Sequence, residues 1–249
     1  EIYSAFFVEE EGTLSSLRGL QEVMETQGLF SSLYTDRGSH YWLTEEAGGK
    51  VDKIRLTQVH RALQQVGVTL IPAYSPEARG RSERVFRTLQ DRLPKELALA
   101  GITEMAVANR YLTEQFLPQY NDRFMVPATE PGTAFIPWVG TNLAEILCVQ
   151  DERVVAKDNT VRYQGLSLQI PQDPHRFHYV KVTVRVHAYP DGTLAVFHGP
   201  RCLARYDADG QLIETGRAQP RRDGPTHGSD VPPIVHPRPT VRATISARG

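Results

Sequence analysis

The periodic pattern of the sequence changes once, near Trp138, and this change constrains the fold more than any other feature. Before it, short runs of β-branched and aromatic residues alternate with segments whose apolar residues recur at helical spacing. After it, short β-type runs follow one another, separated by turn pairs such as Asp191-Gly192 and Gly199-Pro200. The first pattern predicts an α/β unit with parallel strands, and the second predicts a small antiparallel barrel.

The first part of the chain is expected to alternate strands with helices. Strands are predicted at 2–8, 33–35 and 68–71, and helices at about 13–27, at 59–66, from near Glu83 to Leu93, and at 103–116. Thr13 is the predicted cap of the first helix. A polar stretch from Thr44 to Lys53 contains adjacent glycines and is predicted to be an insertion loop.

Two of these helices have predicted inward faces. The helix with Glu83 at its head is expected to bury Val85, Phe86, Leu89 and Leu93, and Pro94 is expected to break or restart it. The helix that ends near residue 116 is expected to turn four residues inward, namely Val107, Tyr111, Leu112 and Phe116.

The second part should contain six short strands, at 154–156, 161–163, 166–170, 180–187, 194–198 and 202–206. From Gly216 onward, proline, glycine and arginine dominate, with six arginines and two aspartates, so this tail is predicted to be basic and disordered. The predicted domains are therefore 1–138, 139–215 and 216–249.

Composition excludes several classes of protein. No apolar run is long enough to cross a membrane, so no membrane partner is expected. The chain has 249 residues and only two cysteines, which favours a reducing, cytoplasmic compartment over a disulfide scaffold. The net charge of −1 does not indicate a nucleic-acid binder, so any such function must rest on local clusters of charge.

Asp36 is the first candidate site residue, because it follows a predicted strand in Thr35-Asp36-Arg37-Gly38. It has an ordinary explanation as a turn residue that accepts local backbone hydrogen bonds. In an open α/β sheet, however, ligands bind at the carboxyl ends of strands. An aspartate at that position is therefore also placed to face a metal ion.

Glu83 is the second candidate, in the stretch Ala73 to Leu93. A glutamate in a first helical turn is ordinarily explained by the helix dipole. Its neighbours favour a further role, because four arginines surround it: Arg79, Arg81, Arg84 and Arg87. Arginine binds phosphate groups bidentately. The alternative is that these arginines form a solvated charged face of the helix.

Together these stretches resemble a known family. Tyr34-Thr35-Asp36-Arg37-Gly38-Ser39, then a strand, then Tyr74-x-Pro76-x-x-x-Gly80-x-x-Glu83 is similar to the core of the integrase and DDE-transposase family. The stretches SPEARGRSERVFRTLQDRLPKEL and FFVEEEG resemble bacterial insertion-sequence transposases of the ISNCY type. The resemblance covers roughly residues 2–138, and the barrel region more loosely.

The resemblance implies an RNase H-like fold in which three carboxylates hold two divalent ions, Mg²⁺ or Mn²⁺. Asp36 matches the second acid of the family and Glu83 the third, while Tyr74 and Arg79 would lie near DNA. It further implies that the complete protein cuts DNA at element ends, joins 3′-hydroxyls to target DNA, and acts as a homo-oligomer on DNA. A bacterial, nucleoid-associated location follows from the same resemblance.

This sequence departs from the family pattern in its first acid, which is absent. The run at 2–8 looks like the third strand of the family, and Glu1 precedes it without a methionine, so an N-terminally truncated fragment is expected. In the family the sheet order is 3-2-1-4-5, and two central strands would be missing here. A catalytically inactive remnant that only binds DNA or multimerises is the alternative hypothesis.

His175-x-x-His178 resembles half of a zinc site, and Cys148 and Cys202 fall in the same predicted barrel. The spacing matches no established zinc module, so a structural metal there is not favoured.

Overall fold

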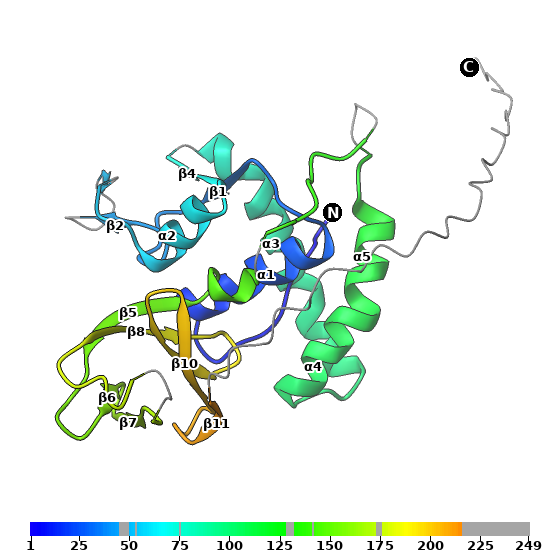
Figure 1. The fold of residues 1–249 in the computed structure, drawn as a ribbon. Helices are drawn as coiled ribbons and strands as arrows, with labels where there is room; N and C mark the ends of the chain where they lie inside the picture. The colour runs from blue at the N-terminus through cyan, green and yellow to red at the C-terminus, as the bar shows by residue number, and fades with distance from the viewer. Residues whose placement is uncertain are drawn as a thin grey trace, which may run out of the picture. The chain divides into compact units, whose positions relative to one another are not determined.

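The computed structural model describes the backbone of residues 1–44, 50–52, 54–74, 76–127, 132–140, 142–172 and 176–215. Within these ranges, the side chains of 76–79, 81, 82, 214 and 215 are not described. Residues 1–216 form one compact unit, whose elements are drawn in Figure 1. The predicted disordered tail, 216–249, lies outside the described residues.

The predicted parallel pairing is present in the first part of the chain. Strands β1 (Ser32–Thr35) and β4 (Thr69–Pro72) pair in parallel, with Ser32 opposite Thr69 and Thr35 opposite Pro72. Parallel strands need a long crossover, and here the chain between them contains helix α2 (Gln58–Gln65). The carboxyl ends of both strands therefore lie at the same edge.

Helix α1 (Thr13–Thr26) packs its apolar face against α2. The buried residues of the two helices have helical spacing, and they are Leu17, Leu20, Met24, Val59, Ala62 and Leu63. Gly12, and not the predicted Thr13, is the N-cap of α1, since the Ser15 hydroxyl accepts its backbone N–H at 2.9 Å. The predicted cap was wrong by one residue.

The predicted strand at 2–8 is not a strand among the described residues. The segment is extended, but side chains on two helices, rather than a neighbouring strand, bond its backbone. Asn121 bonds both the N–H and the carbonyl of Ile2, and Asn109 does the same for Phe7. The predicted strand is therefore wrong: the segment is extended, but helix amides take the place of the expected partner strand.

The predicted insertion loop also contains strands. Strands β2 (Leu43–Thr44) and β3 (Val51–Asp52) pair in antiparallel fashion, Leu43 opposite Asp52. The polar composition concealed these short strands, and residues 45–49 and 53 of the predicted loop lie outside the described ranges.

Helix α3 (Pro76–Leu99) runs through Pro94 without a break, contrary to prediction. Leu89, Leu93 and Leu97 lie on one face, on both sides of the proline, and pack into a core with the helices that follow. That packing offsets the lost backbone hydrogen bond, which ordinarily costs about 3 kcal/mol. Phe86 was predicted to be buried but is 61% exposed, because the first half of α3 leaves this core.

The predicted helix at 103–116 is one part of a longer helical segment. It consists of α4 (Met105–Tyr111), a π-helical stretch from Leu112 to Phe116, and α5 (Leu117–Phe124). Leu112 and Phe116 are buried as predicted, but Val107 is exposed. Val107 lies five residues before Leu112, about 140° around a helix of 3.6 residues per turn, so the face that buries Leu112 leaves Val107 exposed.

The second part is a five-stranded antiparallel sheet covered by a hairpin. The sheet order is β11-β10-β9-β8-β5, with bounds Leu212–Thr215, Arg201–Tyr206, Leu194–His198, Thr183–Ala188 and Val149–Val154. The hairpin strands are β6 (Thr160–Tyr163) and β7 (Leu166–Gln169). Within the described ranges the sheet order is open, so the ladders do not close the predicted barrel.

The two predicted parts share a junction across residue 138. A short 3₁₀ turn at Leu143–Glu145 and the following Ile146 and Leu147 enter the core that α1 and α2 form. The Arg61 guanidinium donates to the carbonyls of Ile146, at 3.1 Å, and Cys148, at 2.6 Å. The proposed boundary at 138 stays a prediction, although the chain on both sides of it contributes to one core.

Glu145 links this junction to the sheet. Its carboxylate accepts hydrogen bonds from the Tyr189 hydroxyl at 2.5 Å and from the Arg205 guanidinium, and it bonds His187 Nδ1 at 3.0 Å. Burial raises the pKa of Glu145, but these three bonds outweigh that effect and bring the pKa down to about 2. The charged form is therefore the one that the fold stabilises.

A search of the described residues for a helix that is both long and apolar enough to cross a membrane finds none.

Candidate active site

The end of β1 is held by a buried hydrogen bond. The Trp42 indole N–H donates to the Thr35 hydroxyl at 3.0 Å, and both residues are buried. The backbone N–H groups of Tyr41 and Trp42 donate to the Gly38 carbonyl at 3.0 and 2.9 Å, which closes a tight turn. The last residue of the strand and the turn after it are thus fixed, and Asp36 lies between them.

Asp36 has the turn-forming role that was weighed for it. Its Oδ1 accepts the Gly38 N–H at 3.0 Å, and the residue is exposed. A carboxylate has about four lone-pair positions, so this bond does not exclude a metal ligand role. Asp36 is therefore a strand-end carboxylate that reaches solvent from a rigid turn.

Tyr74 lies at the end of the neighbouring strand. The parallel register pairs Thr35 with Pro72, and the N–H of the next residue, Ala73, donates to the Thr35 carbonyl at 2.9 Å. The Tyr74 ring is 55% exposed and lies under the Arg37 guanidinium, 5.3 Å from Cζ to the ring centre. Its hydroxyl accepts the Val51 N–H at 3.4 Å.

The structure thus brings Tyr74 next to the turn that carries Asp36, through Arg37. Sequence reasoning did not select Arg37 as a site residue. Its position directly after a strand-end aspartate was the available signal, because residues at that sheet edge share one surface.

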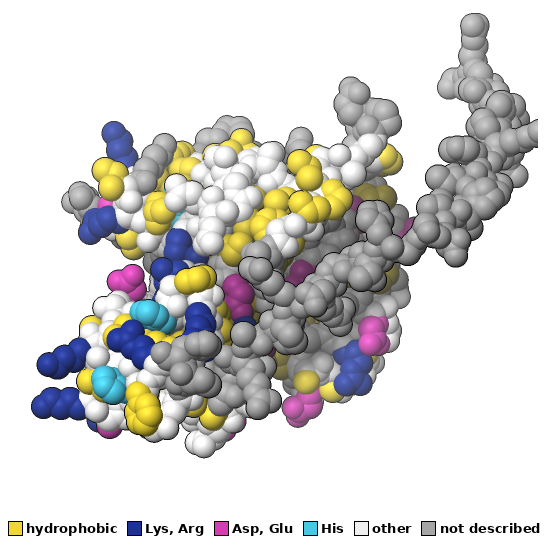
Figure 2. Space-filling model, viewed as in Figure 1, with side chains coloured by type: hydrophobic (Ala, Val, Ile, Leu, Met, Phe, Trp, Pro, Cys, Tyr) yellow, Lys and Arg dark blue, Asp and Glu magenta, His cyan; other side chains and the backbone are white. Residues whose placement is uncertain are grey.

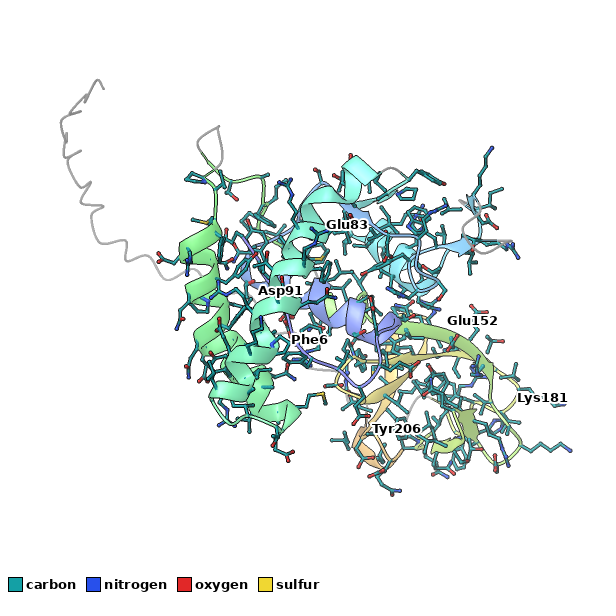
Figure 3. The ribbon with its side chains drawn as sticks, turned by 180° about the vertical axis from the view of Figure 1, so that it is seen from behind. Phe6, Glu83, Asp91, Glu152, Lys181 and Tyr206 are labelled. Atoms are coloured by element: carbon teal, nitrogen blue, oxygen red, sulfur yellow. The ribbon has the colours of Figure 1, made fainter. Side chains whose placement is uncertain are left out.

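Glu83 lies on α3, where Figure 3 labels it together with Asp91. It is the eighth residue of a helix that begins at Pro76, roughly 10 Å along the axis from the start. The helix dipole acts within the first turn, so it does not explain a glutamate at this depth. The ordinary explanation weighed for Glu83 therefore fails, and the residue is exposed.

Two of the arginines selected around Glu83 have described side chains. Arg84 and Arg87 are both exposed and one turn apart, and Arg84 Nε donates to the Gly80 carbonyl at 3.1 Å. Arg87 lies one turn after Glu83 on the same helix face. The side chains of Arg79 and Arg81 lie outside the described part of the structure.

A cavity lies between helix α3, which carries Glu83, and strand β1, which ends one residue before Asp36. Its volume is about 770 Å³, and its lining includes Leu33 of β1, Phe86 of α3 and Phe6 of the extended N-terminal segment. Phe86 follows Glu83 by three residues, so the two lie on neighbouring positions of the helix surface. Phe86 of α3 and Leu33 of β1 therefore face one cavity, and neither Asp36 nor Glu83 is among its described lining residues.

The residues present meet part of what a metal site of this kind requires. Asp36 and Glu83 offer hard oxygen donors, which Mg²⁺ and Mn²⁺ prefer. Among the described residues, no group of three or more His, Cys, Asp or Glu side chains is arranged to hold a metal ion. Asp36 and Glu83 match two of the three acids that the resemblance implies, and both their metal-binding role and their convergence stay predictions.

The zinc ligands that were considered are not assembled by the residues in view. Cys148 is buried, and burial raises the pKa of its thiol to about 11. Its Sγ lies 3.3 Å from the Glu145 carbonyl, to which the thiol donates. His178 is exposed on the sheet domain, and His175 lies outside the described residues. Cys148 is best understood as a packed, protonated thiol.

The sequence is similar to proteins that carry the name transposase. It is 29% identical over 194 residues to a putative transposase, y4bF, of Sinorhizobium fredii, which covers 76% of this chain and 41% of that protein. It is 28% identical over 123 residues to the transposase for insertion sequence IS1202 of Streptococcus pneumoniae, which covers 49% of this chain and 26% of that protein. No protein-family model matches the chain.

These similarities support a transposase family for the chain. The match covers less than half the length of either relative. The DDE and ISNCY assignments, the RNase H-like fold and the metal ions are finer statements, and they stay predictions.

Proposed function

We propose that this chain is part of a DNA transposase of the DDE type, with Asp36 and Glu83 as two of its catalytic carboxylates. The observation that carries the proposal is the position of Asp36, an exposed carboxylate held by a turn directly after β1, at the edge where the carboxyl ends of the parallel strands β1 and β4 lie. The similarity to two proteins named transposases supports the same reading. The proposed fold of the core is RNase H-like.

The cavity also supports the proposal that further strands belong to this core. A parallel pair of strands is rarely stable alone, because parallel sheets are buried on both faces and contain several strands. Here apolar side chains of the extended segment and of β1 face a cavity of about 770 Å³. We propose that strands from another part of the complete protein fill this space and carry the third acid.

Each selected residue has a role in this proposal. Asp36 and Glu83 would hold Mg²⁺ or Mn²⁺, which supplies the activation of an attacking oxygen and the stabilisation of a leaving oxygen in phosphoryl transfer. Arg84 and Arg87, together with Arg79 and Arg81, would bind DNA phosphates at the surface of α3. Tyr74 and Arg37 form a planar, cationic platform at the strand end, next to where a scissile phosphate would lie.

The test uses the chain together with the upstream coding sequence of its gene, and a DNA duplex that ends in the element terminus. The extended protein should cleave this DNA with Mg²⁺, whereas Asp36→Asn or Glu83→Gln should reduce cleavage by at least about 100-fold. A loss of this order is expected when one group that stabilises charge in the transition state is removed. DNA binding should persist, because both changes keep the shape of the side chain.

Asp91→Asn is the matched control, since Asp91 is an exposed acid on the same helix. It should leave cleavage unchanged. Equal losses in Asp91→Asn and Glu83→Gln would show a general charge effect and contradict the assignment. An extended protein that binds DNA but never cleaves it would support the alternative of a non-catalytic DNA-binding remnant.

A further inference from the structure

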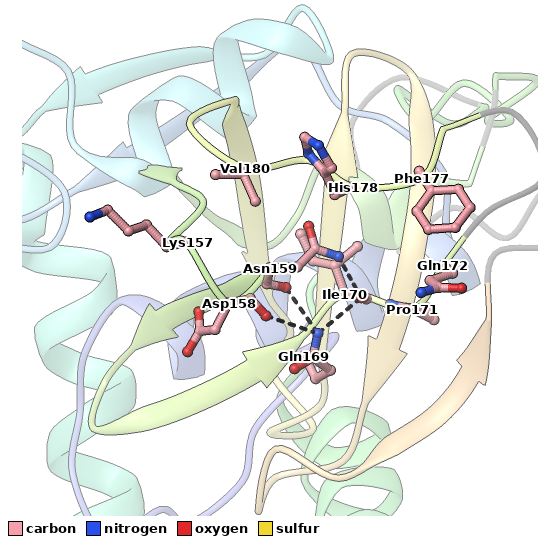
Figure 4. Close-up of a pocket in the computed structure, with 10 residues that line it drawn as sticks. All are labelled: Lys157, Asp158, Asn159, Gln169, Ile170, Pro171, Gln172, Phe177, His178 and Val180. Carbon is pink, nitrogen blue, oxygen red and sulfur yellow. Dashed lines mark hydrogen bonds between the residues drawn. The ribbon is translucent and has the colours of Figure 1, made fainter.

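A groove on the sheet domain lies far along the chain from Asp36 and Glu83. It has a volume of about 510 Å³ and opens between the start of the β6–β7 hairpin and residues 176–180 (Figure 4). Ile170, Pro171 and Val180 form its apolar part, and Ile170 is buried in the core of the sheet. Grooves of roughly 300–1,000 Å³ are the size class of small-molecule sites, such as one nucleotide requires.

Hydrogen bonds among its own residues fix the shape of the groove. The Asn159 amide donates to the Ile170 carbonyl at 2.9 Å and accepts the Tyr179 N–H at 2.7 Å. The Gln169 amide donates to the carbonyls of Asn159 and Ile170, both at 3.2 Å, as Figure 4 shows. The walls are therefore held together before any ligand arrives, which lowers the entropic cost of binding.

Phe177 is the aromatic residue of the groove, and it is 79% exposed. A phenylalanine that remains in water gives up most of the free energy that its burial would contribute. An exposed aromatic ring beside a groove is the usual platform on which single-stranded nucleic acids stack their bases.

Cations surround the same groove. Lys157 lines it, and Arg176 and Lys181 flank the segment that carries Phe177, and all three are exposed. The nearby Asp158 carboxylate accepts two bonds from Thr160, at 3.2 and 2.7 Å, within its own turn. Figure 2 shows Lys, Arg and His side chains on the side of the molecule where β6 and β7 lie, and Figure 3 shows Lys181 extending into solvent.

Lys181 adds an independent observation. Its backbone has φ of 62°, in the left-handed region that glycine or asparagine ordinarily occupies. A lysine is strained there, because its Cβ crowds the following carbonyl oxygen. Strain of this kind is found at functional sites, where the side chain is required for another reason.

We propose that this groove binds an unpaired nucleotide of a DNA strand, with Phe177 stacked on the base and Lys157 and Lys181 on the flanking phosphates. A nucleotide matches both features of the groove, because its base offers a flat apolar face and its phosphates offer negative charge. The inference rests on the proposed function for its choice of DNA. It adds a single-strand subsite that duplex binding does not require.

The test measures binding of the full chain, by fluorescence polarisation, to three labelled DNAs: a short oligothymidylate, an abasic strand of the same length, and a blunt duplex. Phe177→Ala should weaken oligothymidylate binding about tenfold, since stacking contributes about 1–3 kcal/mol per base. It should leave the abasic strand and the duplex unchanged. Ile213→Ala is the matched control, because Ile213 is 61% exposed on β11, and it should change none of the three.

Lys181→Gly tests the phosphate contact of Lys181 separately from any effect on the stability of the fold. It relieves the left-handed strain, so the melting temperature should stay equal or rise. Binding of both single strands should weaken about equally, and the salt dependence should become shallower because one phosphate contact is lost.

Four results would overturn the inference. An equal effect of Phe177→Ala on normal and abasic strands would exclude base stacking. Duplex binding without oligothymidylate binding would leave the proposed function intact and remove the subsite. Unchanged DNA binding with altered self-association in Phe177→Ala, measured by light scattering, would assign the groove to a protein contact. A chain that binds none of the three DNAs would count against the proposed function as well.

Discussion

The side-chain amide of Asn109 makes with the backbone of Phe7 both hydrogen bonds that a neighbouring β-strand would make. Asn109 Oδ1 accepts the Phe7 N–H at 2.6 Å, and its Nδ2 donates to the Phe7 carbonyl at 3.0 Å. The same pairing recurs between Asn121 and Ile2 and between Gln58 and Gln150. Amide side chains on helices thus bond extended backbone at three places in this fold.

Asn109→Ala should release the first of these segments. The backbone groups of Phe7 would lose both partners, which costs about 1–3 kcal/mol for each group that stays buried and unbonded. Hydrogen exchange at the Phe7 amide should become faster, and the melting temperature should fall. Arg110→Ala, an exposed neighbour on α4, should leave the exchange rate of Phe7 unchanged. Unaltered exchange in Asn109→Ala would show that Phe7 is held by other contacts.

The Glu145 cluster should make stability depend on acid pH. The folded pKa of Glu145 is about 2, below its ordinary value near 4.5, so its stabilising contribution is present above the unfolded pKa. That contribution should be lost as the pH falls from about 4.5 toward 2. Glu145→Gln should lower the free energy of unfolding at pH 7 by about 1–3 kcal/mol, because Arg205 loses its charged acceptor.

Urea unfolding at several pH values would check this prediction. The difference in stability between the native protein and Glu145→Gln should shrink toward acid pH. Glu152→Gln is the control, since Glu152 is an exposed glutamate on β5, and it should give a small difference at every pH. A gap that stays constant down to pH 2 would contradict the pKa of Glu145.

Pro94→Ala should stabilise the protein. The proline lies inside α3, and its side chain is exposed, so alanine would restore a backbone donor without loss of core packing. The gain should be about 1–3 kcal/mol, given the cost of proline in a helix interior. Chemical denaturation would measure it. A loss of stability would mean that α3 requires the bend that proline imposes.

Removal of residues 216–249 should weaken DNA binding without altering its sequence preference. This segment contributes six arginines and two aspartates, and each phosphate that it neutralises releases counterions. Affinity for unrelated duplexes should fall by similar factors, and the salt dependence should become shallower. A truncated chain with unchanged affinity and an unchanged salt slope would exclude the tail from DNA binding.

The sequence by itself determined the elements whose apolar spacing is unambiguous. Helices α1 and α2 and strands β1 and β4 were predicted from their periods, because such patterns reflect which face an element must bury. The strand-end position of Asp36 followed from the same reading. Glu83 and the arginines near it were selected from local charge and from a motif, and these features do not depend on distant contacts.

Only the tertiary structure decided what pairs with each element. Ile2 to Val8 has the composition of a strand, yet Asn109 and Asn121, more than 100 residues away, take the partner's place. Helix α3 crosses Pro94 because leucines on either side pack into a shared core. Arg37 contacts Tyr74 because two strands align in parallel register. Local propensity fixes the conformation of a segment, but its partners depend on long-range packing that no short window of sequence contains.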